Sequence, residues 1–324
     1  MRALLCLLLV GCGSFEDPTI VLDLRVLGMR ATPPEQIVDV DLEQPDVTEI
    51  LAQLDDVDIE AIVADPGRER PLRWSMTLCL LDEVDEARCD RTKPTIEIGS
   101  AVIDDPDSYH VPQPIKATLV PNTTMLAMIN EAIRDNPVEA IGGVRLSVVL
   151  TVGDLDDASG DVYAAKHLRI SPRFPSGRSA NANPTLEFVD AALPNGQAVN
   201  VQTMHCGEAL ANNPDAIPAV QPGARVTLFP VERADTREMY LAPTLDGRPM
   251  PLEETITYQW LSTYGAWSDE FTGGGHDALG NQSLLGSDWI APAVSSTLTV
   301  SLWMIQRDER FGVNWFQTCI IVDP

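Results

Sequence analysis

Acidic side chains crowd one short stretch of the chain, where they could hold a metal ion. Asp154, Asp156, Asp157 and Asp161 fall close together, with Ser159 between them. Oxygen ligands of this kind suit calcium, but no frame gives the alternating ligands, the glycine and the distal glutamate of a calcium loop. Hairpin turns use the same residue types. The sequence therefore favours a solvated turn and leaves the four aspartates as a weak calcium candidate.

Tryptophan offers a second kind of chemistry, because its ring can stack on a sugar. Trp267 is followed by Asp269, Glu270 and the glycine run 273–275, which places an aromatic ring beside polar groups. Tryptophans that alternate along strands belong more often to a core, and Trp260 stands where a β-sandwich places its core tryptophan. We keep Trp267, Asp269 and Glu270 as a possible ligand patch.

Signatures of catalysis are absent from the sequence. There is no GxSxG elbow, no HExxH, no phosphate loop and no glycine-rich dinucleotide turn. The four histidines occur singly, at His110, His167, His205 and His276. Carboxylate pairs carry no glycosidase signal in so acidic a chain. We expect no catalytic residue, no cofactor, no bound metal and hence no enzyme; an exported hydrolase is the third and least favoured function.

The N-terminus has the parts of an export signal, followed by a cysteine that could carry lipid. Arg2 precedes the apolar run 3–10, and Gly11 stands before Cys12. The run is too short to span a bilayer. Residues 9–12, Leu-Val-Gly-Cys, resemble the lipobox of bacterial lipoproteins, which implies cleavage after residue 11 and acylation of Cys12. In Gram-negative lipoproteins a residue such as Gly13, rather than aspartate, goes with delivery to the outer membrane.

Cysteine usage indicates an oxidising compartment. Once the signal and the acylated cysteine are set aside, the cysteines that remain are Cys79, Cys89, Cys206 and Cys319. An even number in an exported chain indicates disulfides, with three possible connectivities. We favour the local pairs Cys79 with Cys89 and Cys206 with Cys319. A metal site is disfavoured because no CxxC spacing or nearby histidine completes a ligand set.

The charge of the chain restricts its partners. Acidic residues outnumber basic ones 48 to 22 among 324 residues, for a formal net charge of −26. Such a chain repels nucleic acid and anionic membrane surfaces, and it favours divalent cations or cationic partners. The length is sufficient for two domains, each with its own core.

Two halves of the chain repeat one plan of short strands and polar turns. Strands with alternating apolar residues are predicted at 58–63, 72–76, 144–152, 163–170, 225–229, 256–260, 298–304 and 313–322. Helices are predicted as connections in the first half at 46–54 and 123–136. This pattern predicts a mainly β fold with two Ig-like antiparallel β-sandwiches in tandem.

The domain boundaries follow from composition. The stretch 171–184 is polar, rich in Pro and Gly, and without periodicity, so we predict a linker that proteases cut first. The expected organisation is a signal peptide at 1–11, a tether at 12–18, the first sandwich at 19–170, the linker at 171–184 and the second sandwich at 185–324.

Two parts of the chain carry a family resemblance. Residues 19–34 resemble the mature N-termini of Gram-negative lipoproteins, and the second half resembles bacterial Ig-like modules at Pro222–Gly223, Tyr258–Trp260, Thr263–Gly265 and Trp289–Pro292. The resemblance implies a surface location and a sandwich fold, and it implies no reaction. Antibody-type domains bridge their two sheets with a disulfide, whereas Cys206 with Cys319 would join a loop to the last strand.

These observations predict a lipid-anchored protein of the outer membrane that acts as a structural or interaction module. Its expected partners are the membrane, through the N-terminal lipid, and an envelope protein or polysaccharide; nucleic acid is not expected. The alternative is a carbohydrate-binding surface lipoprotein that uses its second domain.

Overall fold

The computed structural model describes most of the chain after its N-terminal segment. The described residues are 17–39, 47–66, 70–82, 87–104, 115–194, 196, 198–201, 203–204, 206–244, 248–275, 279–281 and 283–324. The predicted signal peptide and Cys12 lie outside them, as do His110, His205 and His276. Within the described part, no helix is long and apolar enough to cross a membrane.

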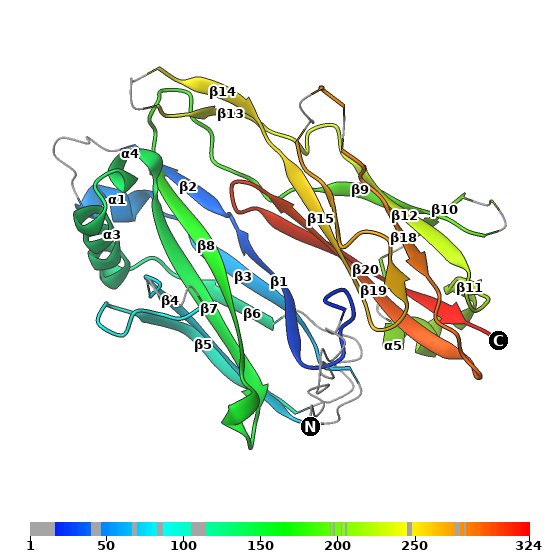
Figure 1. Ribbon diagram of the computed structural model, residues 1–324. Coiled ribbons are helices and arrows are strands. Elements are labelled where there is room, and N and C mark those ends of the chain that lie inside the picture. Colours follow the sequence, from blue (N-terminus) through cyan, green and yellow to red (C-terminus); the bar gives the residue numbers. More distant parts are fainter. Residues whose placement is uncertain are drawn as a thin grey trace, which may run out of the picture.

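The first half of the chain forms a sandwich of two sheets (Figure 1). One sheet holds, in spatial order, β1 (Arg25–Thr32), β3 (Val57–Ala64) and β6 (Ile115–Leu119). The other holds β2 (Glu35–Val38), β8 (Val162–Pro172), β7 (Val144–Asp154), β4 (Leu72–Cys79) and β5 (Ile96–Ile103). Alternate residues of β7 explain the packing, since Val144, Leu146, Val148, Leu150 and Val152 are all buried.

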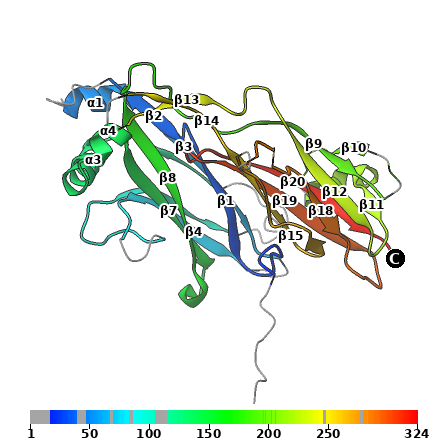
Figure 2. The same cartoon turned by 45° about the horizontal axis from the view of Figure 1, so that its top comes forward.

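The second half forms another sandwich with an added hairpin. One sheet holds β10 (Ala198–Val201), β9 (Leu186–Ala192), β12 (Arg225–Glu232), β18 (Ser287–Ile290) and β16 (Ala266–Trp267). The other holds β11 (Ala219–Val220), β20 (Val313–Val322), β19 (Leu298–Asp308), β15 (Ile256–Ser262) and β17 (Phe271–Gly273). The hairpin of β13 (Met239–Ala242) and β14 (Met250–Glu253) lies at the same end of the molecule as β2, as Figures 1 and 2 show.

The two sandwiches share one topology. In each, the first strand pairs antiparallel with the next long strand, β1 with β3 and β9 with β12. Between these two strands the chain crosses to the other sheet, where β2 runs parallel to β8 and β11 runs parallel to β20. The last strand pairs with the one before it, and that strand pairs with the strand that carries a tryptophan, Trp74 or Trp260. The prediction of two Ig-like sandwiches in tandem is confirmed.

Short helices connect the strands. They are α1 (Val47–Gln53), α3 (Thr123–Asp135), α4 (Glu139–Gly142), η1 (Ala158–Gly160), α5 (Cys206–Asn212) and η2 (Pro214–Ala216). The side chain of Asn122 caps α3 by accepting from the backbone N–H groups of Thr124 and Met125. The apolar face of α3 packs into the first core, as its helical spacing predicted. Of the other predicted helix, the expected cap Asp46 lies outside the described residues.

The predicted linker is a packed connection rather than a solvated tether. Ser171 and Pro172 belong to β8, and the side chains of Ser171, Arg178 and Asn181 are buried. Polar composition suggested solvent exposure, but these side chains find partners inside the molecule. We therefore expect proteases to cut elsewhere first, because backbone that is held by buried contacts resists cleavage.

Candidate functional site

An apolar cluster joins the two sandwiches at one part of their junction. It contains Val21, Leu27, Ile62 and Ala64 from the first half and Leu261, Trp303, Ile305 and Val313 from the second. Strand β1 contacts β20 here, which agrees with their neighbouring positions in Figures 1 and 2. At its margin, the Arg30 guanidinium lies 4.4 Å from the centre of the Trp315 ring and donates to Asn314 Oδ1 at 2.9 Å. Continuous apolar contact of this kind opposes domain motion.

The segment before β1 attaches to the second sandwich. The N–H of Val21 donates to the carbonyl of Ser262 at 2.8 Å, and the N–H of Ser262 donates to the carbonyl of Thr19 at 2.9 Å. The chain therefore touches β15 before it enters the first sandwich. Asp17 fixes the preceding turn, since its Oδ1 accepts from Thr19 N at 2.9 Å and from Thr19 Oγ1 at 2.7 Å.

Another part of the junction is built around one buried carboxylate. Glu35 Oε1 accepts from Ser171 Oγ at 2.6 Å and from Arg178 Nη2 at 2.9 Å. Its Oε2 accepts from Arg310 Nη2 at 2.7 Å and from the N–H of Asn181 at 3.0 Å. Burial alone would raise the pKa of Glu35, but the Ser171 bond and the two guanidinium charges hold it below its ordinary value. We call these five residues the junction ionic core.

The turn between β19 and β20 presents Arg310 to this core. Asp308 Oδ1 accepts from the N–H groups of Arg310 at 2.8 Å and Gly312 at 2.7 Å. The Asn181 side chain donates to the carbonyl of Arg310 at 3.1 Å. Phe311 has φ of 80°, a left-handed conformation that is costly for a bulky residue and that closes the turn. The turn is thus held from both sandwiches.

Lys166 of β8 contacts the same turn from the first sandwich. Its Nζ donates to the carbonyl of Phe311, and the residue is buried. Burial lowers the pKa of Lys166 to about 7, against the opposing effect of Asp308, whose charge favours the ammonium. The ammonium form of Lys166 is therefore less favoured than that of an exposed lysine.

Glu254, just after β14, lies on the other side of Arg310. Its Oε1 is 3.8 Å from Arg310 Nη1 and accepts no hydrogen bond among the described residues, whereas Glu238 Oε2 accepts from Arg310 Nη1 at 3.2 Å. Burial, reinforced by the charge of Asp308, raises the pKa of Glu254 to about 8. The hairpin thus extends the polar junction with a buried carboxyl group whose neutral form is favoured.

The arrangement holds four parts of the chain in one geometry. The groups of the ionic core are directed at one another, from β2, β8, the connection and the β19–β20 turn. A buried ionic group of this kind fixes one geometry, and removal of a single partner costs about 3–5 kcal/mol because the other charge stays buried.

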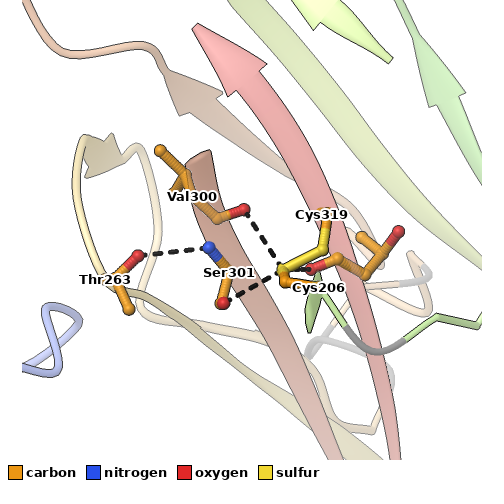
Figure 3. The surroundings of a disulfide bond; sticks show 6 residues. Cys206, Thr263, Val300, Ser301 and Cys319 are labelled. Atoms are coloured by element: carbon orange, nitrogen blue, oxygen red, sulfur yellow. Dashed lines mark hydrogen bonds between the residues drawn. A yellow bond between two sulfur atoms is a disulfide. The ribbon is translucent and has the colours of Figure 1, made fainter. Parts of the chain in front are cut away.

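Both predicted disulfides are confirmed. Cys79 pairs with Cys89 and Cys206 with Cys319, with Cα atoms 5.5 Å and 5.4 Å apart. Cys206 is the first residue of α5, not part of a loop, and Cys319 lies on the last strand β20 (Figure 3). Ser301 Oγ lies 3.1 Å from Cys206 Sγ, and Ser301 N donates to Thr263 Oγ1 at 3.1 Å. The bond therefore fixes α5 against one sheet and does not bridge the two sheets.

The acidic turn between β7 and β8 is held by protein groups. Asp154 pairs with Arg70 at 3.3 Å and Asp161 pairs with Arg73 at 2.6 Å. Asp157 accepts from the N–H of Ser159, while Asp156 is exposed and its N–H donates to Asp154 Oδ1. In the part of the chain that the structure describes, no three acidic, histidine or cysteine side chains converge to hold a metal ion.

The residues of the possible ligand patch differ in their exposure and contacts. Trp267 is half-buried, packs against Trp260 with ring centres 5.2 Å apart, and donates to Ser262 Oγ at 3.2 Å. Asp269 is exposed, and the backbone carbonyl of Glu270 accepts from the N–H of Trp260. The Trp267 ring is thus joined to the second core.

Sequence reasoning missed the junction ionic core. Glu35 follows a pair of prolines, Arg178 and Asn181 stand in a segment of linker composition, and Arg310 stands in a hairpin turn. None of these local patterns distinguishes a buried charge from a solvated one. The one signal in the sequence was that these segments hold more polar residues than their turns require.

Comparisons with known proteins find only distant structural similarity. No protein-family model and no curated protein matches the chain. It is similar to the two tandem V-type regions of a v-region-containing chitin-binding protein, VCBP3, at 11% identity and a TM-score of 0.26, over 93% of this chain and 100% of that one. It is also similar to an α2-macroglobulin of Salmonella, at 10% identity and a TM-score of 0.21, over 95% of this chain and 17% of that one. At these TM-scores the likeness carries no argument about fold or function. The molecule's own strand order defines its class, a mainly β protein with two Ig-like sandwiches.

Proposed function

We propose that this chain is a non-catalytic interaction module of the outer membrane, anchored by a lipid on Cys12, whose two sandwiches act as one rigid body. The observation that carries the proposal is the junction. A binding module gains from rigidity because less conformational freedom is lost when the partner binds. Domains joined by a small polar contact move by default, whereas these are joined by both an apolar cluster and the junction ionic core.

The sequence Leu-Val-Gly-Cys at residues 9–12 supports the anchor. Thr19 is bonded to Ser262, and seven residue steps separate Cys12 from Thr19. A chain of that length spans at most roughly 25 Å. A lipid on Cys12 would therefore keep the junction close to the bilayer and leave the far ends of the sandwiches for contact with partners.

Metabolic labelling with a palmitate analogue tests the anchor. We expect label in the wild type and in Cys6→Ala, and none in Cys12→Ala. Several acyl chains are needed for stable anchoring, so Cys12→Ala should also leave the membrane fraction. Equal labelling of the wild type and Cys12→Ala would refute the anchor.

Distances between spin labels test the rigid body. Labels on the exposed residues Ala127 of α3 and Ala216 of η2 span the junction, and labels at Ala127 and Ala101 of β5 stay within the first sandwich. We expect narrow distance distributions for both pairs. Arg310→Met should broaden only the pair that spans the junction, and a broad distribution for that pair in otherwise unchanged protein would contradict the proposal.

A further inference from the structure

A cavity of about 260 Å³ lies at the junction of the two sandwiches. Its walls come from β1, from β8 and from the β19–β20 hairpin, which lies next to β1 in Figures 1 and 2. A water molecule takes up about 30 Å³ of the liquid. The cavity therefore has room for a small charged group and a short chain. The lining residues that matter are Leu27, Met29, Lys166, Arg307, Asp308 and Val313.

Lys166 brings a buried cation to this cavity, since its residue is only 4% exposed. Its side chain runs from β8 to the opposite sandwich, where Nζ donates to the carbonyl of Phe311, which also lines the cavity. An ammonium group has three N–H donors. The described part of the chain supplies this one acceptor and no carboxylate at ion-pair distance. Taking a charge out of water is costly unless an opposite charge compensates it.

Arg307 is a second cation that lines the cavity. Its Nη1 donates to Gln259 Oε1 at 3.0 Å, and its Nη2 donates to the carbonyl of Leu27 at 3.4 Å. Both acceptors are uncharged, and among the described residues Arg307 forms no ion pair. Burial lowers the pKa of Lys166 most, and the charge of Arg307 lowers it further, so the two cations repel each other.

Asp308 lines the cavity too, but its oxygens are occupied within the junction. Oδ1 accepts from the N–H groups of Arg310 and Gly312, and Oδ2 accepts from Asn181 Nδ2 at 3.2 Å. The charge of Asp308 favours the ammonium form of Lys166 without forming an ion pair with it. The cavity thus holds two cations that lack a paired anion, in a chain whose net charge is −26.

The rest of the lining selects the kind of anion. Leu27, Met29 and Val313 are buried apolar residues of the cavity wall. Ligand sites commonly combine such a lining with a few polar groups that fix the orientation of the ligand. The net negative charge of the chain would repel a dianion more strongly than a monoanion. A monocarboxylate with a short apolar chain meets both conditions.

We propose that this cavity binds a small organic monocarboxylate, whose charged group accepts from Lys166 and Arg307 and whose apolar chain contacts the buried lining. Hydrogen bonds between charged groups are roughly twice as strong as those between neutral ones. Both sandwiches would hold the ligand, because Lys166 belongs to β8 and Arg307 belongs to β19. The proposal goes beyond the interaction role and the lipid anchor and rests on neither.

Three small probes test the ligand class on the full chain without its signal. Butyrate is the expected kind of ligand, butyramide has a similar shape without the charge, and inorganic phosphate has a charge without the apolar chain. In calorimetric titrations we expect butyrate to bind at least tenfold more tightly than either of the others. Butyramide or phosphate that bound as tightly as butyrate, or no binding of butyrate, would overturn the proposal.

Matched lysine variants test the location. Lys166→Met removes the buried charge and keeps an unbranched side chain, and it should weaken the binding of butyrate at least tenfold. Lys116→Met, which changes an exposed lysine of β6, should change the affinity less than threefold. Equal weakening by the two variants would contradict the site.

Arg307 provides a second test, which does not require Lys166→Met to fold. Arg307→Lys keeps a cation and should bind butyrate more tightly than Arg307→Met, with melting temperatures to show that both variants are folded. Butyrate should also raise the melting temperature of the wild type, because a ligand that binds only the folded state stabilises it. Equal affinities of the two Arg307 variants would overturn the role of its charge.

Discussion

The two sandwiches have the same strand order, but they complete their cores in different ways. In the second, Trp260 of β15 is inaccessible to solvent, packs against Trp267 and donates to Thr272 Oγ1 at 2.8 Å. In the first, the equivalent Trp74 of β4 is only half-buried, and the apolar face of α3 contributes much of the core. In one and the same topology, the core can therefore be filled either by a central aromatic residue or by an added helix.

The disulfides of the two sandwiches also differ, in the length of chain that each one closes. Cys79–Cys89 closes a loop of 10 residues at one edge of the first sandwich, whereas Cys206–Cys319 spans 113 residues of the second. The disulfide of the second sandwich thus joins residues far apart in sequence, and that of the first joins nearby residues. This difference predicts unequal effects of equivalent substitutions.

The largest effect is expected from the disulfides. In the chain-entropy model, replacing Cys206 and Cys319 by serine lowers the free energy of unfolding by about 4–5 kcal/mol, and replacing Cys79 and Cys89 lowers it by about 2–3 kcal/mol. Chemical denaturation of both double variants measures the difference. A larger loss from the short loop would contradict the model for this chain.

The tryptophans should rank next. Trp260→Ala removes a buried ring and should cost about 3–5 kcal/mol, whereas Trp74→Ala should cost less because its ring is already partly solvated. Calorimetry of the two variants checks the ranking. Equal losses would mean that the helix does not compensate for the exposed ring in the first sandwich.

Two buried groups at the junction should make stability depend on pH in opposite directions. The pKa of Glu254 is about 8 in the folded protein and about 4.5 unfolded, so the unfolded state loses the proton first and stability falls between pH 4.5 and 8. The pKa of Lys166 is about 7 folded and about 10.5 unfolded, so the unfolded state keeps the proton longer and stability rises between pH 7 and 10.5. Each slope approaches about 1.4 kcal/mol per pH unit at most.

Denaturation midpoints from pH 5 to 10 separate the two groups. Glu254→Gln should reduce the fall below pH 8, and Lys166→Met should reduce the rise above pH 7. Glu49→Gln, an exposed carboxylate, serves as control. Profiles unchanged in both junction variants would show that neither group titrates as stated.

The smallest effect is expected at Trp267. Its contact with Trp260 and its bond to Ser262 predict a loss of about 1–2 kcal/mol in Trp267→Ala, in keeping with the value of an aromatic pair plus one hydrogen bond. Thermal unfolding measures it. A variant that kept full stability but lost binding to a polysaccharide would favour the carbohydrate-binding alternative instead.

The strands and disulfides could be predicted from sequence because their signals are local. Alternation in β7 and β19, the helical spacing of α3 and the parity of the cysteines each depend on neighbouring residues or on counting. The junction could not be predicted in this way. Glu35 and Arg310 are 275 residues apart, and each is an ordinary polar residue until the fold brings them together.

The attachment of Thr19 and Val21 to Ser262 has a mechanical consequence. Any tension that enters the chain from its N-terminal end reaches β15 through these bonds before it reaches Arg25, where β1 begins. The second sandwich, which lies later in the sequence, therefore shares the force with the first from the outset. Pulling on the N-terminal end would load the junction between the two sandwiches at once, before the strands of the first sandwich separate one by one.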